Sequence, residues 1–536
     1  MVVCYFLYGE KHMGIYLNPG NETFAQMSSD PYYVDKTGML AVLNDFIDKG
    51  NKYICISRPR RFGKTVTGNM ISAYYSKKCD SSQLFSRLKI SSGPGYEEKR
   101  NKYNVIKIDM NSEYQGAVIK EKLISRLTMK IKRELSREFP NVKLTEEDSL
   151  AESLVEIYAV TGETFIILID EYDVMVREKV EEKLFLEYLS FLNGLFKSDT
   201  LRPAISLAYL TGILPVVRDK IQSKLNNFEE YTMLDALELT EYVGFTSEEV
   251  KTLCAKHGVE YQECKNWYDG YHQNGYEIYN PQSVVKLVST KKYRNYWGMT
   301  SSYQVIADRI KANFKGIKDD IIKMLSGESV DVNVTRYINT MDSFVDKADV
   351  FTYLIHLGYL AFNIEDGTCR IPNREIRTEW VNAISANSEY EVTNHIIESS
   401  KELLKETLAG NENAVAQALD ASHIHVTSNR SYNNEDALAS AIYLAYLYAL
   451  NEYTAIKEVT AGKGFADVVY IPLDASKTAL VIELKRNDSA ESGIEQIKSK
   501  RYFDCLSQYK GNLLLVGINY DEQTKTHEAK IEKYRK

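Results

Sequence analysis

The sequence predicts an α/β protein in three parts: a parallel sheet flanked by helices, a mainly helical middle region, and a smaller C-terminal α/β domain. Three observations support this prediction. The apolar strand Tyr53–Ile56 leads through a basic loop into a helix, the apolar strand Phe165–Ile169 ends in two carboxylates, and the strand-like segment Ala479–Lys485 carries Glu-x-Lys. Alternating strands and helices favour a parallel sheet. The expected domains are residues 14–285, 286–400 and 401–536.

The first strand opens a pattern that is typical of phosphate binding. Tyr53–Ile56 is short and apolar, Ser57–Phe62 forms a loop, and Gly63, Lys64 and Thr65 begin a helix. Loop amides and a helix N-terminus offer N–H groups and partial positive charge to phosphate oxygens. In this arrangement Lys64 reaches the β- and γ-phosphates and the hydroxyl of Thr65 holds Mg²⁺. The sequence therefore predicts a P-loop NTPase domain with ATP and Mg²⁺ as cofactors.

The loop departs from the usual pattern at one position. GxxxxGK[ST] has glycine where this chain has Arg58. Together with Arg60 and Arg61, this residue makes the loop strongly cationic, so we assign all three arginines to nucleotide binding. The alternative is a basic turn between a strand and a helix that contains Gly-Lys-Thr by coincidence.

Polar side chains follow two later strands. Phe165–Ile169 is apolar throughout, as expected of a strand buried on both faces, and Asp170 and Glu171 come directly after it. Asp170 is expected to bind Mg²⁺ and Glu171 to polarise the attacking water. Thr211 follows the apolar strand Ile205–Leu210, where it could sense the γ-phosphate. The alternatives are an acidic helix N-cap for the carboxylates and a turn threonine for Thr211.

The other elements are read from periodicity and turn residues. A further strand is expected at Val105–Met110. Helices are expected at Lys36–Lys49, 116–140 and 146–160, and another begins with a capping box at Thr246. The aromatic and turn-rich segment from Asn266 to Pro281 is interpreted as a packed β-turn element, and residues 285–400 as helical without a catalytic constellation.

Charge and cysteine usage limit the function classes. A formal net charge of −8 over 536 residues argues against a protein coated in basic residues, although a local basic groove is compatible with it. The seven cysteines are scattered and contain no CxxC, which indicates reduced cytoplasmic thiols. Cys254, His257, Cys264 and His272 do not have the spacing of a zinc site.

No segment of the sequence predicts membrane insertion. Residues 1–8 are apolar but too short for a span or a signal sequence, and no later apolar run approaches 18 residues. We therefore expect a cytoplasmic protein without a membrane partner. Translation could start at Met1 or at Met13, and the oligomeric state stays open, with a homo-oligomer as one alternative.

The C-terminal part carries a second candidate site. Asp467 begins one expected strand, and Glu483 and Lys485 lie two residues apart on the next, so they share a face. An Asp followed by Glu-x-Lys across a hairpin is the PD-(D/E)xK nuclease arrangement, in which the carboxylates bind Mg²⁺ and the lysine orients water. Glu435 on the preceding helix is a further expected metal ligand, and Gln496 is an expected supporting residue.

Two more residues are expected near this site, and the charged strand also has a simpler interpretation. Glu458 lies just before the hairpin, and Tyr502 is expected on the helix that carries Gln496. The alternative is a charged face on an edge strand, a common arrangement without catalytic function.

These motifs occur in an order that resembles a known family. The chain resembles the bacterial proteins that join a predicted AAA-type ATPase-like domain to a C-terminal PD-(D/E)xK nuclease-superfamily domain. The resemblance rests on SRPRRFGKT, LIDEYD, LTGILP, WYDGYH, IPNREIR, GKGFADVV and VIELK, among others, and covers nearly the whole chain. It implies ATP binding and a nuclease fold. The family usually has a basic residue directly before the hairpin aspartate, where this chain has Phe465-Ala466, and Lys463 is the nearest substitute.

The sequence therefore predicts an ATP-binding and ATP-hydrolysing switch coupled to a metal-dependent nuclease-like domain. Nucleic acid is the expected partner, with DNA and RNA not distinguished. The main alternative is a regulatory ATPase whose C-terminal domain binds nucleic acid or protein without cleaving it. A small-molecule kinase is a third interpretation, disfavoured because Asp170-Glu171 suits water activation.

Overall fold

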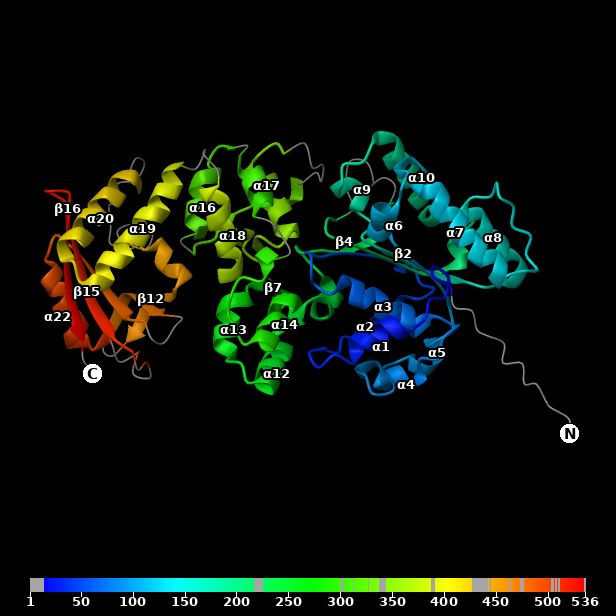
Figure 1. Ribbon diagram of the computed structural model, residues 1–536, viewed down its shortest axis with the longest axis horizontal. Coiled ribbons are helices and arrows are strands. Elements are labelled where there is room, and N and C mark those ends of the chain that lie inside the picture. Colours follow the sequence, from blue (N-terminus) through cyan, green and yellow to red (C-terminus); the bar gives the residue numbers. More distant parts are fainter. Residues whose placement is uncertain are drawn as a thin grey trace. The chain divides into compact units, whose positions relative to one another are not determined.

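The computed structural model forms two compact units, and Figure 1 labels many of their helices and strands. The first comprises Met1–Tyr296 and Asp331–Pro372, and the second Trp297–Val330 and Asn373–Lys536. The structure describes residues 14–215, 225–299, 303–311, 313–325, 327–336, 344–386, 391–426, 442, 445–461, 464–472, 477–502, 506, 509 and 511–534.

The first unit contains a five-stranded parallel sheet in the order β2-β3-β4-β1-β5. The strands are β1 (Tyr53–Ser57), β2 (Asn104–Asp109), β3 (Phe165–Asp170), β4 (Ile205–Gly212) and β5 (Glu229–Tyr231). Because all pairs are parallel, the carboxyl ends of the strands meet at one edge, where open α/β sheets bind ligands. β4 lies between β1 and β3, so its end separates the loop after β1 from the carboxylates after β3. The predicted parallel sheet with flanking helices is confirmed.

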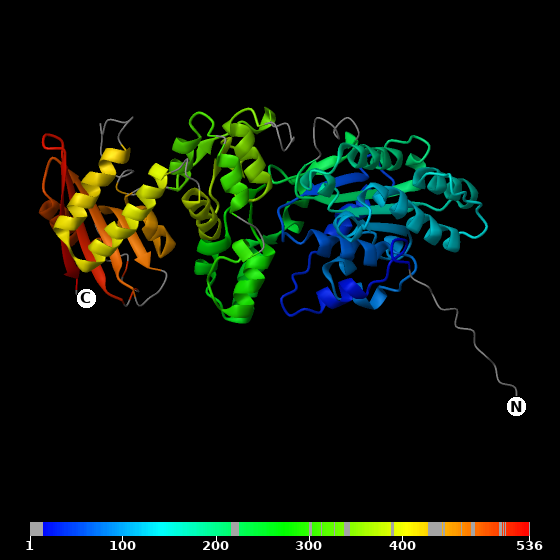
Figure 2. The same cartoon turned by 45° about the horizontal axis from the view of Figure 1, so that its top comes forward.

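Helices cover both faces of this sheet, as Figures 1 and 2 show. The alternation of β1 explains the two layers: Cys55 packs on one face with Leu127 and Leu192, and Ile54 packs on the other with Leu40. One face carries α1 (Glu22–Ser28), α2 (Met39–Phe46), α3 (Lys64–Tyr75), α4 (Ser82–Phe85) and α5 (Tyr96–Lys99), and the other α6 (Met110–Gly116), α7 (Leu123–Glu138), α8 (Leu150–Thr161), α9 (Val174–Arg177) and α10 (Glu182–Phe196).

Several predicted helices are shorter than their periodic segments. The helix expected over 116–140 is α7, which begins only at Leu123 because a 3-10 turn, Lys120–Lys122, precedes it. The capping box expected at Thr246 is present, with Glu249 accepting a hydrogen bond from the Thr246 amide at 2.9 Å. The helix expected over 146–160 is α8, which begins only at Leu150, after a capping box formed by Ser149 and Glu152.

The remainder of the first unit forms smaller layers. The expected β-turn element contains the hairpin of β7 (Tyr271–Gln273) and β8 (Tyr276–Tyr279), which pairs with β6 (Phe245–Thr246). Beside it lie α12 (Ser247–His257), α13 (Tyr261–Tyr268) and α14 (Pro281–Thr290). A further sheet has β10 (Ala361–Asn363), β11 (Thr368–Arg370) and β9 (Val330–Asp331), with α17 at Lys347–His356.

The second unit combines helices with a mixed sheet in the order β12-β13-β14-β15-β16. β14 and β15 are parallel and the other pairs are antiparallel. The helices are α15 (Gln304–Ile310), α16 (Ile317–Leu325), α18 (Arg374–Ser385), α19 (Glu391–Ala409), α20 (Glu412–Val426) and α22 (Ala490–Lys500). The strands are β12 (Tyr453–Ala461), β13 (Gly464–Pro472), β14 (Ala479–Arg486), β15 (Leu513–Asp521) and β16 (Thr526–Tyr534). The helical middle region and the C-terminal α/β domain are thus confirmed.

Two glycines allow α22 to pack closely on this sheet. A Cβ at Gly517 of β15 would lie 2.0 Å from the carbonyl oxygen of Ala490, and a Cβ at Gly493 of α22 would lie 3.2 Å from the Cα of Gly517. Any side chain at Gly517 must therefore displace helix backbone. This close approach determines the distance between α22 and the neighbouring strand β14.

Gly517→Ala should destabilise the second unit by about 1–3 kcal/mol, the usual cost of overpacking a well-packed contact. Urea unfolding of the full chain measures the loss. Gly50→Ala is the matched control, since a Cβ at Gly50 has no heavy atom within 4 Å. Equal stability of both variants would show that α22 moves without cost.

Candidate functional site

The carboxylate of Asp170 is the centre of the site at the edge of the parallel sheet. The hydroxyl of Thr65 donates a hydrogen bond to its Oδ2 at 2.8 Å, and the hydroxyl of Thr211 donates to its Oδ1. Asp170 is only 7% exposed, and a carboxylate buried to that degree requires such donors. The structure thus brings together three residues that are 105 and 41 positions apart in the chain.

The order of the strands explains why Thr65, Asp170 and Thr211 lie close together. Thr65 lies in the first turn of α3, directly after the loop that follows β1, and Thr211 is part of β4. Gly63 precedes α3 with φ of 87°, in the left-handed region that favours glycine. The hydroxyl and carboxylate oxygens of Thr65 and Asp170 are hard donors, which fit Mg²⁺.

Lys64 lies inside the phosphate-loop segment. Its ammonium donates to the carbonyl oxygens of Arg58 at 2.8 Å and Pro59 at 2.9 Å, and the side chain is buried. Burial lowers the pKa of Lys64, and the nearby carboxylates of Glu171 and Asp170 act in the opposite direction. The carbonyl oxygens of Arg58 and Pro59 therefore hold the ammonium of Lys64 inside the loop.

The three arginines of the loop do not share one environment. Arg58 is buried, and its guanidinium donates to the carbonyl oxygen of Thr232 and to Oε1 of Gln273 at 2.8 Å. Burial lowers the pKa of Arg58 to about 9. Arg60 and Arg61 are exposed. Arg58 thus ties the loop to the chain after β5 and to β7, and its assignment to nucleotide binding stays a prediction, as do those of the other two.

Glu171 follows Asp170 with a left-handed backbone, φ of 54°. Burial raises the pKa of Glu171, whereas Arg177, whose guanidinium donates to Oε2 of this carboxylate, lowers it. Sequence reasoning missed both Arg177 and Asp173. Their spacing of four residues was the available signal, since such pairs face each other on a helix.

The second candidate site lies on β13 and β14. Oδ2 of Asp467 accepts a hydrogen bond from the Leu484 amide at 2.7 Å, and the ammonium of Lys485 lies 3.0 Å from Oε1 of Glu483. The last register pair of the two strands is Val468↔Ile482, which places Asp467 alongside Glu483. The structure therefore brings the three predicted residues together on one sheet.

Glu483 has one satisfied and one unsatisfied oxygen. Its Oε1 accepts hydrogen bonds from Lys485 and Gln496, whereas Oε2 is buried and accepts none from the described residues. Burial, followed by the charge of Asp467, raises the pKa of Glu483 to about 7. A buried carboxylate oxygen without a donor is costly, and a divalent cation would satisfy it. The donor set therefore fits Mg²⁺.

Gln496 connects this pair to the helix above the sheet. Its Oε1 accepts a hydrogen bond from Lys485 at 2.7 Å, and its Nε2 donates to the hydroxyl of Tyr502 at 3.0 Å. Tyr502 lies beyond the end of α22 at Lys500, and the expectation that it belongs to the same helix is corrected accordingly. Glu435 lies outside the described residues.

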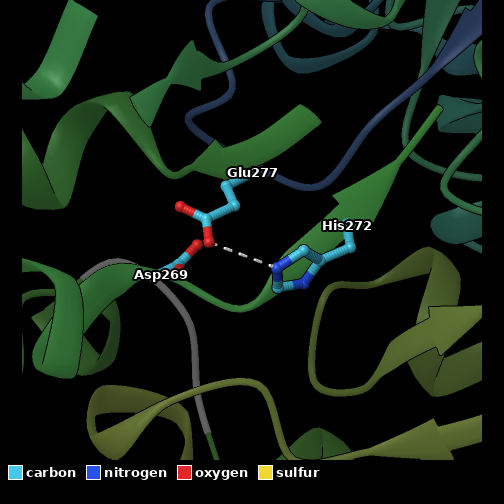
Figure 3. Close-up of side chains that lie close together, drawn as sticks. All are labelled: Asp269, His272 and Glu277. Atoms are coloured by element: carbon cyan, nitrogen blue, oxygen red, sulfur yellow. Dashed lines mark ion pairs between the residues drawn. The ribbon is translucent and has the colours of Figure 1, made fainter. Parts of the chain in front are cut away.

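A third polar cluster was not foreseen from the sequence. Asp269, His272 and Glu277 offer ligand atoms within 4.8 Å of one another, with His272 Nε2 at 3.6 Å from Glu277 Oε1 (Figure 3). Lys265 Nζ also pairs with Glu277 and lies 3.7 Å from Asp269 Oδ2, and Arg370 Nη2 lies 3.3 Å from His272 Nδ1. Because protein cations already balance these carboxylates, the cluster is explained as an ion-pair network.

Among the helices of the described residues, none combines the length and the apolar character that crossing a membrane requires.

Two family models match this chain. Residues 19–222 match the model described as a predicted AAA-ATPase, and residues 433–530 match the model of the PD-(D/E)XK nuclease superfamily. The first match contains Thr65, Asp170 and Thr211, and the second contains Asp467, Glu483 and Lys485.

A curated relative covers part of the chain. An uncharacterized protein in the vnfD 5′ region of Azotobacter chroococcum mcd 1 is 26% identical over 304 residues, which are 54% of this chain and 55% of that protein. The chain thus spans about half the length of this relative.

Solved structures show only a distant likeness. The ORC2 protein of Aeropyrum pernix, with ADPNP and ADP, is 10% identical and covers 67% of this chain and 97% of its own, with a TM-score of 0.27. The ORC1 protein of the same organism, in complex with DNA, is 10% identical and covers 82% and 90%, with a TM-score of 0.24. These TM-scores are too low to establish a shared overall fold.

Proposed function

We propose that this chain, whose residues 19–222 match the predicted AAA-ATPase model and whose residues 433–530 match the PD-(D/E)XK nuclease superfamily model, is an ATP-hydrolysing switch coupled to a metal-dependent phosphodiesterase acting on nucleic acid. The observation that carries the ATPase assignment is the convergence of Thr65 and Thr211 on the buried carboxylate of Asp170.

Binding of ATP is proposed to exchange contacts within the loop. Lys64 releases the carbonyl oxygens of Arg58 and Pro59 and donates to the terminal phosphates, while the loop amides and the start of α3 bind phosphate oxygens. Thr65 and Asp170 are the residues that would hold Mg²⁺, which supplies charge neutralisation at the β- and γ-phosphates. Thr211, already bonded to the same carboxylate, is positioned to respond to the γ-phosphate.

Hydrolysis is assigned to Glu171. Its Oε2 is engaged by Arg177, and no described residue donates to its Oε1. That second oxygen can accept a proton from a water that attacks the γ-phosphate. Glu171 therefore acts as the general base, and Asp170 would serve as a ligand of Mg²⁺.

The C-terminal domain is proposed to act on a phosphodiester. Asp467 and Glu483 would hold Mg²⁺, which stabilises charge on the phosphate and activates water. Lys485, fixed by Glu483 and Gln496, is placed to orient that water. The support for this proposal is the buried, unsatisfied Oε2 of Glu483.

The proposed setting is the cytoplasm. The described cysteines, Cys55, Cys79, Cys254, Cys264 and Cys369, are all buried, and no disulfide joins any two of them, consistent with a reducing compartment. Assembly into a homo-oligomer stays a prediction.

Lys64→Ala should weaken ATP binding by roughly tenfold to 150-fold, because one charge-assisted hydrogen bond contributes about 1.5–3 kcal/mol. Isothermal titration calorimetry of the full chain with Mg·ATP measures it. Lys78→Ala is the matched control, since Lys78 pairs with Glu138 elsewhere. If Lys64→Ala binds Mg·ATP as tightly as the parent protein does, the phosphate-loop assignment is wrong.

Glu171→Gln should keep ATP affinity within about twofold and lower turnover by at least about 100-fold, because the amide packs similarly but accepts no proton. Phosphate release under saturating ATP measures turnover, and Glu178→Gln at an exposed neighbouring position is the control. Turnover within twofold of the parent protein would mean that another group positions the water.

Asp467→Asn should abolish metal-dependent cleavage and leave ATP hydrolysis intact, because the two sites belong to different units. Plasmid DNA and RNA are incubated with the protein and Mg²⁺ or Mn²⁺, with and without ATP, and Glu495→Gln on the exposed side of α22 is the control. If the parent protein binds nucleic acid but cleaves none under any of these conditions, the regulatory ATPase with a binding domain replaces the nuclease.

A further inference from the structure

We propose that Arg177 is a positioning residue for Glu171, which it holds at the carboxyl end of β3 with one carboxylate oxygen left for water; this inference rests on the proposed ATP hydrolysis. No motif recognised in the sequence includes Arg177. It is the last residue of the short helix α9, six positions after Glu171.

The contacts of Arg177 form a short chain through the site. Its Nη2 donates to Oε2 of Glu171, and its Nε lies 3.2 Å from Oδ2 of Asp173. The arginine side chain is 11% exposed. The guanidinium is planar, so its hydrogen bond to Glu171 and its ion pair with Asp173 place the two carboxylates relative to each other.

Asp173 anchors this chain at its other end. Its Oδ2 accepts hydrogen bonds from the amides of Ile213 at 3.0 Å and Leu214 at 2.9 Å, directly after β4. The side chain of Asp173 is 1% exposed. Because Asp173 is fixed to the backbone that follows Thr211, its ion pair holds Arg177 next to the end of β4.

The charges near Glu171 explain why it requires such a partner. The carboxylates of Asp173 and Asp170 repel that of Glu171, and among the described residues the charges of Arg177 and Lys64 are the principal attractive ones. Lys64 is assigned to phosphate once ATP binds. Arg177 is then the cation that remains for Glu171, and without it the carboxylate would turn away from its two negative neighbours.

A purely structural role for Arg177 is the competing explanation. Its ion pair with Asp173 spans four residues, the spacing that stabilises helices. Such a role predicts lower stability for every substitution but no selective effect on the chemical step. The comparison of kcat with ATP affinity separates the two explanations.

The test uses full-length Arg177→Gln and Arg177→Lys, each alone and in the Glu171→Gln background, with thermal unfolding as a check on folding. Arg177→Gln should lower kcat by about tenfold to 100-fold, the effect of misplacing a catalytic group by about 1 Å, with ATP dissociation constants within about twofold. Arg177→Lys should restore most of the turnover. In the Glu171→Gln background neither change should lower turnover further, because Arg177 acts through Glu171.

Arg100→Gln is the matched control, since Arg100 also forms an ion pair with a carboxylate, that of Glu97. Parallel losses of affinity and kcat, an additive loss in the Glu171→Gln background, or a kcat that rises in Arg177→Gln would each overturn the role of Arg177. If the parent protein hydrolyses ATP and Arg177→Gln has the same turnover, the role of Arg177 is overturned and the proposed hydrolysis stands. A parent protein that hydrolyses no ATP overturns the proposed hydrolysis and the role of Arg177 with it.

Discussion

The buried carboxylate of Asp170 is the constraint on which the nucleotide site depends. Its two oxygens accept hydrogen bonds from Thr65 and Thr211, so the start of α3, the end of β3 and the end of β4 are held at one point. A charged group in this position is tolerated only because both oxygens have donors. The strand order with β4 between β1 and β3 provides those donors, and the surrounding apolar layers on both faces of the sheet keep the point fixed.

The C-terminal site is built on the opposite principle. Glu483 carries one oxygen that is fully engaged by Lys485 and Gln496 and another that no described residue satisfies. The protein therefore retains a local electrostatic cost within a sheet that is otherwise well packed. Close packing of α22 at Gly517 keeps Gln496 in reach of β14, which means that backbone contact and site geometry are coupled.

The three polar clusters described above differ in the groups that pair with their carboxylates. At Asp170 the donors are hydroxyls, at Glu483 a lysine satisfies one oxygen, and at Glu277 Lys265 pairs directly with the carboxylate. The difference between the last two lies in the second oxygen: Oε2 of Glu277 accepts a hydrogen bond from Ser247, whereas Oε2 of Glu483 accepts none from the described residues. Proximity of carboxylates alone therefore does not distinguish a metal site from an ion-pair network.

The sequence by itself determined the elements that depend on local patterns. Apolar runs located β1, β3, β4 and β14, Gly-Lys-Thr located the start of α3, and strand alternation placed Glu483 and Lys485 on one face. The tertiary structure alone decided which side chains meet across long separations. It directed Arg58 toward Thr232 and Gln273, which lie 174 and 215 positions away in the chain. Local periodicity reports which face of an element is buried, but the partner of a polar side chain depends on strand order and on helix packing, which no local pattern encodes.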